Sequence, residues 1–385
     1  MSATIKRLVR FARLRFEFGR VPKADICIID SDSASLLRRY FPDKKVLTIE
    51  VGIARRYFFP LLACLFRGQS TIDAYIALVI NRSKASLALS LQDNLVPLFK
   101  VKPRLKYARI ALIQNGIRAG FNDLFSSAKV VDTKLEVDYY LSFTNAVEDQ
   151  IHELASARVE TIGSFRSNVF AKAPSVRGVL SYISTYNPEV PLRTAISVDL
   201  STPAVTYEDV LARRIEILEI VAEYMVSLGY RLGILGKQGG SNAVLEEAFY
   251  RDRLPAIHFT YQPRDNYGDN YQRVDESWIS VSTSSTLGYE SLGRGNRTGI
   301  FQGDSILLGD SSLRFGWPAQ LPPEGPFWST TCTKERIVEV LELLHHSDDS
   351  EWSTVREEFA HLIPNLDSGN SRFVNLFKEF GATGA

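Results

Sequence analysis

Short apolar runs alternate with longer amphipathic segments over most of the chain. Such runs are typical of strands that are buried on both faces of a parallel sheet. In the first half of the chain they lie at residues 25–30, 45–49, 86–90, 109–113, 138–143 and 159–162. In the second half they lie at residues 179–184, 231–235, 256–260, 278–281 and 297–301. Because helical patterns separate most successive runs, the chain is expected to consist of βαβ units.

Helical periodicity is clearest between these runs and near the end of the chain. We expect helices within residues 52–80, 205–227, 242–250, 287–293, 334–346 and 351–362. The polar residues 171–177, which include Pro174, separate the two series of strands and are expected to form a linker. The pattern therefore predicts an α/β fold with two Rossmann-like, doubly wound domains, residues 1–170 and residues 178–385, that face a cleft. The closing helices are assigned to the second domain, although they could also cross back to the first.

Composition excludes several classes of protein. The chain has 385 residues, of which 45% are hydrophobic and 23% charged, a balance typical of a globular protein in solution. The formal net charge of +1 gives no indication of a nucleic-acid partner. No apolar run is long enough to span a membrane. Because Cys27, Cys64 and Cys332 predict neither a disulfide framework nor a zinc site, we expect no metal, no cofactor and a cytoplasmic location.

The first residues combine basic and apolar side chains. Residues 4–19 alternate Lys or Arg with large apolar residues, and a basic amphipathic helix of this kind can lie on an anionic membrane surface. This interpretation places the protein on the inner face of the plasma membrane. The alternative is a helix packed on the first domain with its arginines in water.

Residues 278–301 carry the clearest chemical signal. An apolar run leads to the hydroxyl-rich residues 282–286, and a helical segment that contains Glu290 follows them. Serine and threonine are preferred N-caps, and a helix N-terminus at the carboxyl end of a strand can bind an anion. A carboxylate one turn into the helix could then accept hydrogen bonds from a ribose. The alternative is that the hydroxyl groups only cap the helix and solvate a loop.

Residues 284–290, followed by Gly293-Arg294-Gly295, resemble the C-terminal donor-site segment of GT-B glycosyltransferases. Within that fold the chain most resembles the bacterial surface-carbohydrate group that includes β-Kdo transferases. Further matching segments are residues 113–118, 163–168, 315–318 and 325–328. The resemblance implies a nucleotide-sugar co-substrate, a CMP-linked ulosonic acid such as Kdo, and a lipid-linked or surface-glycan acceptor such as lipopolysaccharide. It also implies that Glu290 holds the ribose of the nucleotide.

Other functions are compatible with the same fold. A transferase could use a UDP-linked sugar. A nucleotide-sugar 2-epimerase would need neither a lipid-linked acceptor nor a membrane surface. A non-catalytic partner in glycan assembly could also have this fold, because a fold does not determine a function.

Candidate binding residues follow the predicted strands, at whose carboxyl ends such sheets bind ligands. On the donor side they are Gly236, Lys237, Pro263 in the polar loop 261–270, Ser284, Ser285, Thr286 and Glu290. On the acceptor side they are Gln114, Asn115 and Arg118, whose guanidinium group could bind a phosphate or a sugar carboxylate. Ordinary turns are the alternative at residues 114–116 and 236–240.

Asp93 and Asp32 are the candidates for a catalytic carboxylate, because each follows a predicted strand. Asp32 lies in the polar stretch 30–33, which is expected to be a turn. An Asx turn is the alternative for Asp93, and Asp30 and Asp199 compete for the role. His258 lies within an apolar run and is expected to be a hydrogen-bonded core residue rather than a general base.

Overall fold

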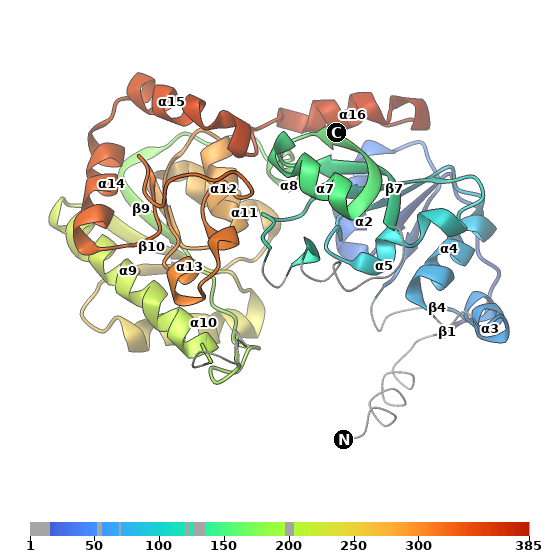
Figure 1. Ribbon diagram of the computed structural model, residues 1–385, viewed down its shortest axis with the longest axis horizontal. Coiled ribbons are helices and arrows are strands. Elements are labelled where there is room, and N and C mark those ends of the chain that lie inside the picture. Colours follow the sequence, from blue (N-terminus) through green and yellow to red (C-terminus); the bar gives the residue numbers. More distant parts are fainter. Residues whose placement is uncertain are drawn as a thin grey trace. The chain divides into compact units, whose positions relative to one another are not determined.

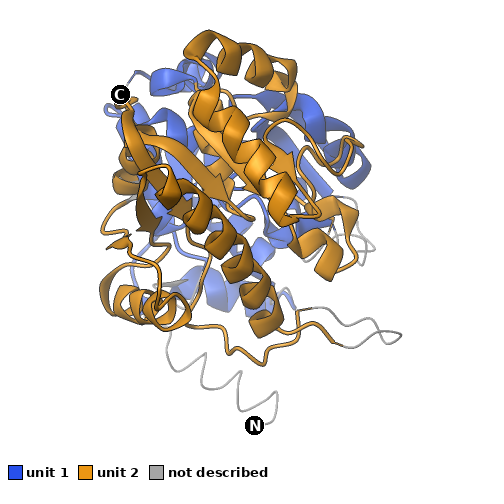
Figure 2. Ribbon diagram, turned by 90° about the vertical axis from the view of Figure 1, so that its left-hand side faces the viewer, with its two compact units in different colours: residues 1–116, 122–169, 367–385 blue, residues 117–121, 170–366 orange. Residues whose placement is uncertain are grey.

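The computed structural model describes residues 16–51, 56–68, 71–120, 123–125, 135–196 and 204–384 (Figure 1). The chain forms two compact units, which Figure 2 shows in different colours. Unit 1 comprises Met1–Gly116, Asn122–Val169 and Asp367–Ala385, and unit 2 comprises Ile117–Phe121 and Phe170–Leu366. Residues 367–385, at the end of the chain, therefore belong to unit 1, while the predicted closing helices at 334–346 and 351–362 lie in unit 2.

Unit 1 is built on six parallel strands in the order β3-β2-β5-β6-β7-β8. They are β2 (Ile26–Ile29), β3 (Val46–Ile49), β5 (Leu87–Ser90), β6 (Arg109–Ile113), β7 (Leu135–Ser142) and β8 (Ala155–Thr161). A separate parallel pair consists of β1 (Phe16–Glu17) and β4 (Arg56–Tyr57). After β2 the chain adds β3 on one side and then β5 on the other. The strand order therefore reverses between β2 and β5, and open α/β sheets bind ligands at such a point.

The end of the chain completes the core of unit 1. The helices of this unit are α2 (Ser31–Leu37), α3 (Phe58–Phe66), α4 (Ile72–Ser83), α5 (Val96–Phe99), α7 (Glu148–Leu154), α8 (Phe165–Asn168) and α16 (Ser371–Leu376). Phe373 of α16 packs against Tyr40 and Phe165, with ring centroids 5.5 Å and 4.9 Å apart. Asn370, which is fully buried, donates hydrogen bonds to the Tyr40 hydroxyl (2.8 Å) and the Phe165 carbonyl oxygen (3.0 Å). These contacts explain why residues 367–384 belong to this unit.

Unit 2 contains a second sheet of six parallel strands, in the order β11-β10-β9-β12-β13-β14. They are β9 (Val176–Ile183), β10 (Arg231–Leu235), β11 (Thr260–Gln262), β12 (Ser277–Ser282), β13 (Arg297–Phe301) and β14 (Trp328–Ser329). The helices are α9 (Tyr207–Ser227), α10 (Gly240–Arg253), α11 (Tyr267–Glu276), α12 (Thr286–Gly293), α13 (Asp304–Leu307), α14 (Lys334–His346) and α15 (Asp349–Glu358). This is the 3-2-1-4-5-6 order of a Rossmann fold, which reverses between β9 and β12. The two sheets confirm the predicted α/β fold with two Rossmann-like halves.

A buried ion pair attaches the predicted linker to unit 2. The side chains of Arg294 and Asp275 are fully buried and pair through two guanidinium nitrogens. Arg294 also donates to the carbonyl oxygens of residues 170–171, at 3.1 Å and 3.0 Å, and Asp275 accepts from the N–H of Ala173 (3.0 Å). Buried charges are stable only when their hydrogen bonds are satisfied, so these bonds fix the start of the linker. β9 begins at Val176, so it includes the last two residues of the predicted linker.

Two predicted turns or loops contain the start of a helix. In the stretch 30–33, Asp30 is the N-cap of α2, so the following residues are helical. In the stretch 261–270, helix α11 begins at Tyr267, after a capping box formed by Asn266 and Asp269. Polar residues that cap a helix resemble those of a turn, because both satisfy backbone N–H groups with side-chain oxygens.

The prediction for His258 is wrong. The strand expected at 256–260 is the edge strand β11, which begins only at Thr260. His258 is exposed, while Phe259 next to it is buried. The buried side chain of Phe259 attaches this segment to the unit, so the histidine does not enter the core.

Gly288 lies where α12 packs closely on β12. A Cβ atom at this position would overlap the side chain of Ser282 and would lie 3.2 Å from Cδ1 of Ile300. We expect Gly288→Ala to lower the free energy of unfolding by about 1–3 kcal/mol, because the helix or the strand must shift. Thermal denaturation measures the change. Gly19→Ala is the control, since no atom lies within 4 Å of a Cβ there, and equal melting temperatures for the two variants would contradict the packing argument.

Candidate functional site

The loops that follow the strands of unit 2 meet at one edge of its sheet, because all its strands run in parallel. β9 and β12 are the neighbours between which the strand order reverses. The loops after β9, β10, β12 and β13 bring Thr185, Lys237, Ser284 and Asp304 to this edge. We call it the carboxyl edge of unit 2.

Glu246, on α10, connects the ends of three strands at the carboxyl edge. Its fully buried carboxylate accepts hydrogen bonds from the N–H groups of Lys237 (3.0 Å) and Gln238 (2.8 Å), which follow β10. It also accepts from the hydroxyl of Ser184, after β9, and from the hydroxyl of Tyr261 in β11 (2.9 Å). Four donors compensate the cost of burying the charge. The loops after β9 and β10 are therefore held in one geometry.

Arg214, on α9, brings a guanidinium group to the point where the strand order reverses. It pairs with Asp304, which follows β13, through Nε and Nη2. Its Nη1 donates to Oγ1 of Thr185 after β9 (2.7 Å), and its Nη2 donates to Oγ of Ser284 after β12 (2.7 Å). The side chain is 13% exposed. Its bonds fix the orientation of the guanidinium group at this edge.

Lys237 adds a second cation to this edge. Partial desolvation and the positive charge of Arg214 lower the pKa of the Lys237 ammonium group, against the opposing effect of Glu246, and Arg264 lowers it further. The effect of Arg214 means that the two cations lie close enough to repel each other. A phosphate or carboxylate bound beside them would relieve this repulsion. The carboxyl edge therefore favours an anionic ligand.

The N-terminus of α12 lies at the same edge. Ser285 is its N-cap, as the hydroxyl cluster predicted, and its side chain accepts from the N–H of Leu287 (3.3 Å). Ser284 is exposed, whereas the hydroxyl of Thr286 accepts from the backbone N–H of Ile117 (3.1 Å). Of these candidate hydroxyl groups, that of Ser284 is the most accessible to a ligand.

Glu290 lies one turn into α12 and is 4% exposed. Its Oε1 accepts a hydrogen bond from the hydroxyl of Tyr271 on α11 (3.0 Å), and Tyr271 stacks on Phe170 with ring centroids 5.2 Å apart. The aromatic pair thus holds the carboxylate in place. The binding of a ribose by Glu290 stays a prediction.

Two further donor-side candidates support the geometry of their loops. A Cβ atom at Gly236 would overlap the hydroxyl of Tyr261, so the end of β10 requires a glycine. The carbonyl oxygen of Pro263 accepts from Arg273 (2.6 Å), and that of Gly236 accepts from Asn270 (3.0 Å). Helix α11 therefore holds the loops after β10 and β11.

Asp93 follows β5 in unit 1 and is fully buried. Its Oδ1 accepts from the N–H of Asn115 (3.0 Å), and its Oδ2 accepts from the hydroxyl of Tyr140 (2.7 Å). This carboxylate fixes the loop after β6, which carries the acceptor-side candidate Asn115. In this structure the geometry suits a positioning residue, and a catalytic role for Asp93 stays a prediction.

The predicted acceptor-side residues belong to different units. Gln114, in unit 1, donates to the carbonyl oxygen of Gly116 (2.8 Å) and accepts from the N–H of Phe143 (2.8 Å). Arg118 is 4% exposed and belongs to the segment of residues 117–121 that is part of unit 2. This division could not be predicted from the sequence, because these residues are close neighbours in the chain.

Asp30 joins the ends of β2 and β5, where the strand order of unit 1 reverses. Its backbone angles, φ 76° and ψ 153°, lie in a region that residues other than glycine rarely occupy. Its carboxylate accepts from the N–H (2.8 Å) and hydroxyl (2.6 Å) of Ser33, whose oxygen accepts from the N–H of Leu91 (2.9 Å). Asp32 is exposed in the first turn of α2. Asp199 lies outside the described residues.

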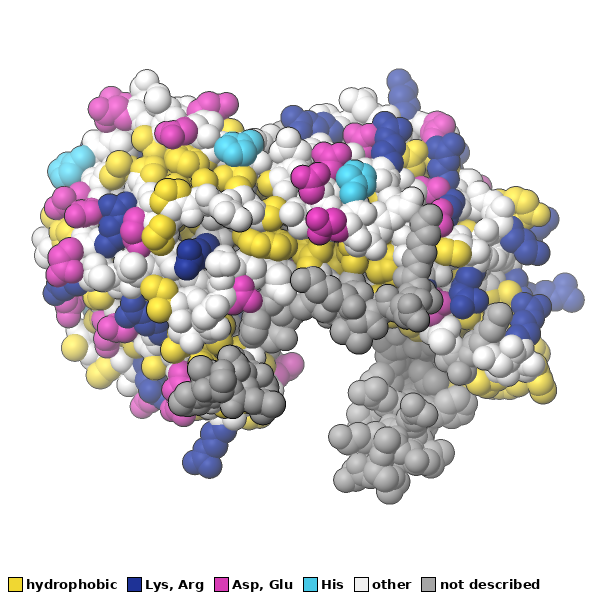
Figure 3. Space-filling model, in the orientation of Figure 1, with side chains coloured by type: hydrophobic (Ala, Val, Ile, Leu, Met, Phe, Trp, Pro, Cys, Tyr) yellow, Lys and Arg dark blue, Asp and Glu magenta, His cyan; other side chains and the backbone are white. Residues whose placement is uncertain are grey.

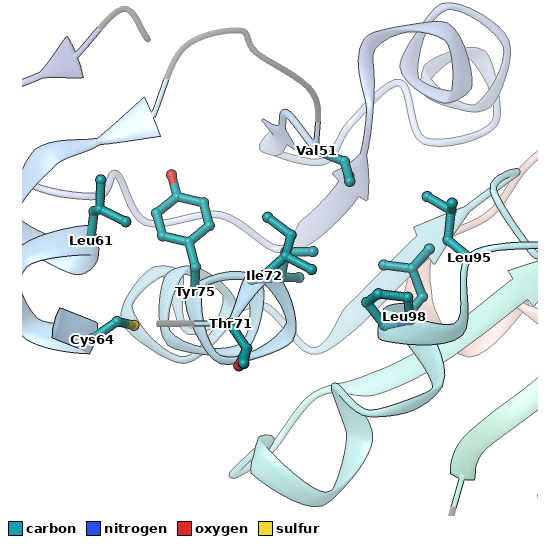
Figure 4. Close-up of a pocket in the computed structure, with 10 residues that line it drawn as sticks. Val51, Leu61, Cys64, Thr71, Ile72, Tyr75, Leu95 and Leu98 are labelled. Atoms are coloured by element: carbon teal, nitrogen blue, oxygen red, sulfur yellow. The ribbon is translucent and has the colours of Figure 1, made fainter. Parts of the chain in front are cut away.

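A pocket of about 400 Å³ lies in unit 1 between α3, α4 and the segment that leads into α5 (Figure 4). Its lining is mostly apolar and consists of Val51, Leu61, Cys64, Thr71, Ile72, Tyr75, Ile76, Leu95, Pro97 and Leu98. The hydroxyl of Tyr75 already accepts from the N–H of Tyr57 (2.9 Å). A pocket with so few polar groups suits a hydrocarbon group better than a nucleotide.

Helix α3 lines this pocket and also exposes large apolar side chains. Phe59 is 49% exposed, Leu65 48% and Phe66 83%, and Phe18 (65%) packs on Phe58 with ring centroids 4.9 Å apart. Figure 3 shows hydrophobic side chains at the position of α3, with Lys and Arg side chains beside them. We call Phe18, Phe59, Leu65 and Phe66 the α3 surface. Residues 4–15 of the predicted amphipathic helix lie outside the described residues.

Two kinds of feature are not found in the described part of the chain. No group of three or more His, Cys, Asp or Glu side chains there is arranged to hold a metal ion. No helix in the same part has both the length and the apolar character needed to cross a bilayer.

Two residues that organise the carboxyl edge of unit 2, Arg214 and Glu246, were not predicted from the sequence. Both lie on helix faces that are otherwise buried. Arg214 lies three residues after Leu211 and four before Leu218, and Glu246 lies between Ala243 and Tyr250 with helical spacing. A charge on the apolar stripe of a helix is the signal that could have found them.

A family model described as "putative O-antigen biosynthesis protein" matches residues 111–381. No curated protein sequence matches the chain. Among solved structures, sucrose-phosphate synthase from Thermosynechococcus elongatus is similar, with a TM-score of 0.50 and 9% identity, over 92% of this chain and 98% of the other. A "putative UDP-N-acetylglucosamine 2-epimerase" from Listeria monocytogenes is similar, with a TM-score of 0.50 and 12% identity, over 94% and 98%. At these identities the likeness shows a common GT-B fold and does not extend to activity.

Glu246→Gln tests the network at the carboxyl edge. The amide would present two N–H donors where the carboxylate accepts four hydrogen bonds, so at least one buried donor loses its partner. We expect the free energy of unfolding to fall by about 1.5–3 kcal/mol, measured by denaturant titration. Glu247→Gln is the matched control, because its exposed pair with Arg251 contributes about 0–1 kcal/mol. A loss no larger than that of the control would show that the network does not stabilise the unit.

Proposed function

The chain belongs to the O-antigen biosynthesis family whose model matches most of its length, and from this premise we propose that it is a glycosyltransferase of surface-glycan synthesis. The enzyme moves a sugar from a nucleotide donor to a glycan acceptor. Unit 2 binds the nucleotide, and unit 1 provides the acceptor side. The GT-B fold supports this division of roles, since it contains one Rossmann-like sheet for each.

The observation that carries the proposal is the pair of cations at the carboxyl edge of unit 2. Arg214 contacts the residues after β9 and β12, where the order of the Rossmann sheet reverses, and Lys237 follows the neighbouring strand β10. Ser284, beside the N-terminus of α12, is bonded to Arg214. A nucleotide phosphate suits this arrangement, because cations and helix N–H groups both favour its charge. The bonds of Arg214 to Asp304, Thr185 and Ser284 orient the group before any ligand binds. Phosphate binding then requires little reorganisation.

The donor we propose is a CMP-linked ulosonic acid such as Kdo. The support is the resemblance of residues 284–290 to the donor segment of β-Kdo transferases. Glu290 would accept hydrogen bonds from the ribose, and Tyr271 keeps its carboxylate oriented. A UDP-linked sugar is the alternative donor for the same edge.

Nucleotide binding tests this proposal. We expect CMP to bind the full-length protein with higher affinity than UDP in calorimetric titrations. Glu290→Gln should weaken CMP binding about tenfold or more, because the loss of a charge-assisted hydrogen bond costs about 1.4 kcal/mol or more. Glu247→Gln, on the exposed face of α10, should leave the affinity unchanged.

Each other outcome has a distinct meaning. Preferential binding of UDP would replace the CMP-linked donor with a UDP-linked one. Unchanged affinity in Glu290→Gln, together with a lower melting temperature, would reduce Glu290 to a structural partner of Tyr271. No binding of any nucleotide would contradict the transferase proposal and favour a non-catalytic role.

We further propose that unit 1 contacts the inner face of the plasma membrane, where a lipid-linked acceptor would be found. The α3 surface supports this, because exposed aromatic side chains on one short helix favour the boundary between headgroups and acyl chains. Arg67 and Arg82 are exposed. Both lie near α3, because their charges oppose the rise in the pKa of Cys64 that burial causes. Cations beside an apolar surface favour anionic lipids. The apolar pocket behind α3 would then hold hydrocarbon of the acceptor.

Liposome sedimentation tests the membrane contact. We expect the double variant Phe59→Ser, Phe66→Ser to reduce binding to anionic liposomes tenfold or more, because burial of one such side chain contributes about 1.5–3 kcal/mol. Tyr107→Ser is the matched control, since Tyr107 is 80% exposed in the same unit and outside the α3 surface. Equal binding by the double variant and the wild-type protein would contradict a role for α3.

A further inference from the structure

A second cavity, with a polar lining, lies in unit 2 at the edge of the sheet opposite the carboxyl edge. Its volume is about 500 Å³. Ser277 and Arg297, the first residues of β12 and β13, line it together with linker residues 172–175 and side chains of α15. In a parallel sheet the starts and the ends of the strands lie at opposite edges, so this cavity is separate from Arg214 and Lys237. We call it the linker pocket.

Three cationic side chains line the linker pocket without a full set of partners. Arg297 is 6% exposed and donates to Oδ1 of Asp349 (2.8 Å), but its buried Nε has no hydrogen-bond partner. Lys172 and Arg356, within the part of the chain that the structure describes, form no side-chain hydrogen bond or ion pair. The lining has three cationic side chains and one carboxylate, that of Asp349, so positive charge is in excess in the pocket.

The groups around Lys172 also carry more positive than negative charge. Its side chain is exposed, yet partial desolvation lowers the pKa of its ammonium group, and the nearby Arg294 and Arg356 add to the shift. Asp275 opposes the shift most strongly, and Asp349 opposes it less. The Asp275 carboxylate is already bonded to the guanidinium group of Arg294 inside the protein, so it does not neutralise the pocket.

Aromatic rings and hydroxyl groups complete the lining. The guanidinium carbon of Arg297 lies 4.0 Å from the ring centroid of Trp278, whose buried Nε1 has no hydrogen-bond partner. Trp352 donates its N–H to the carbonyl oxygen of Gly295 (3.1 Å) and is thereby fixed in the wall. Ser353 adds a hydroxyl group. Indole rings, hydroxyl groups and cations together suit a ligand that has both a sugar-like body and an anionic group.

We propose that the linker pocket binds a monosaccharide-sized organic anion, a sugar that carries a phosphate or a carboxylate. The anionic group contacts Lys172 and Arg356, and the body of the sugar lies against the tryptophan side of the pocket. The site is additional to the nucleotide site and does not depend on the transferase proposal. Its occupant would also contact residues 172–175, so binding would restrain the linker.

Calorimetric titration of the full-length protein tests the proposal with four probes: glucose 6-phosphate, glucuronate, glucose and inorganic phosphate. We expect at least one of the two anionic sugars to bind more tightly than inorganic phosphate, and glucose not to bind. Lys172→Gln and Arg356→Gln should each reduce the affinity for that sugar tenfold or more. The difference between phosphate and carboxylate probes identifies the anionic group.

Arg231→Gln is the matched control, because Arg231 is an exposed arginine at the start of β10 and does not line the pocket. Lys237→Gln is a second control that affects only the carboxyl edge, and both controls should bind the sugar as the wild type does. Melting curves show whether the pocket variants are folded. Failure of both anionic sugars to bind, undiminished affinity in Lys172→Gln and Arg356→Gln, or loss of binding in Lys237→Gln alone would each overturn the proposal.

Discussion

The buried carboxylate of Glu246 is the constraint on which the carboxyl edge of unit 2 depends. A carboxylate that is buried away from water must accept hydrogen bonds from donors within the protein. Here the donors come from the segment after β9, the segment after β10 and the strand β11. The backbone of Lys237 is therefore held in place by its N–H, which is bonded to Glu246, while the residue itself is exposed. Glu246 thus fixes the loop that carries Lys237, one of the two cations that favour an anionic ligand at this edge.

A near-neutral net charge conceals two local excesses of positive charge in unit 2. The formal net charge of the chain is +1, but cations gather at the carboxyl edge and again in the linker pocket. At the carboxyl edge Asp304 neutralises part of the charge of Arg214. In the linker pocket, Lys172 and Arg356 form no such ion pair with any residue that the structure describes. Local charge, rather than total charge, is what distinguishes a surface that binds small anions from one that attracts nucleic acid.

The sequence predicted the fold better than the site. All strands of the two sheets except β14 were predicted, because apolar runs in a parallel sheet are continuous and short. Helices that begin in polar stretches, such as α2 and α11, were missed, since caps and turns use the same residues. Arg214 and Glu246 were missed because each is a single charge within an apolar helix face, and only the folded chain shows which donors and acceptors meet there. Arg118 was grouped with Gln114 because closeness in sequence does not show which unit a residue joins.

The return of the chain to unit 1 affects how the protein is made. Phe373, Phe377 and Asn370 are part of the core that contains Tyr40 and Phe165. The ribosome releases these residues only after all of unit 2 has been synthesised. Unit 1, although its strands emerge first, cannot close its core during translation, whereas most of unit 2 is contiguous and can fold earlier. Until then unit 1 lacks part of its core, and apolar surface that stays exposed during synthesis is prone to aggregation.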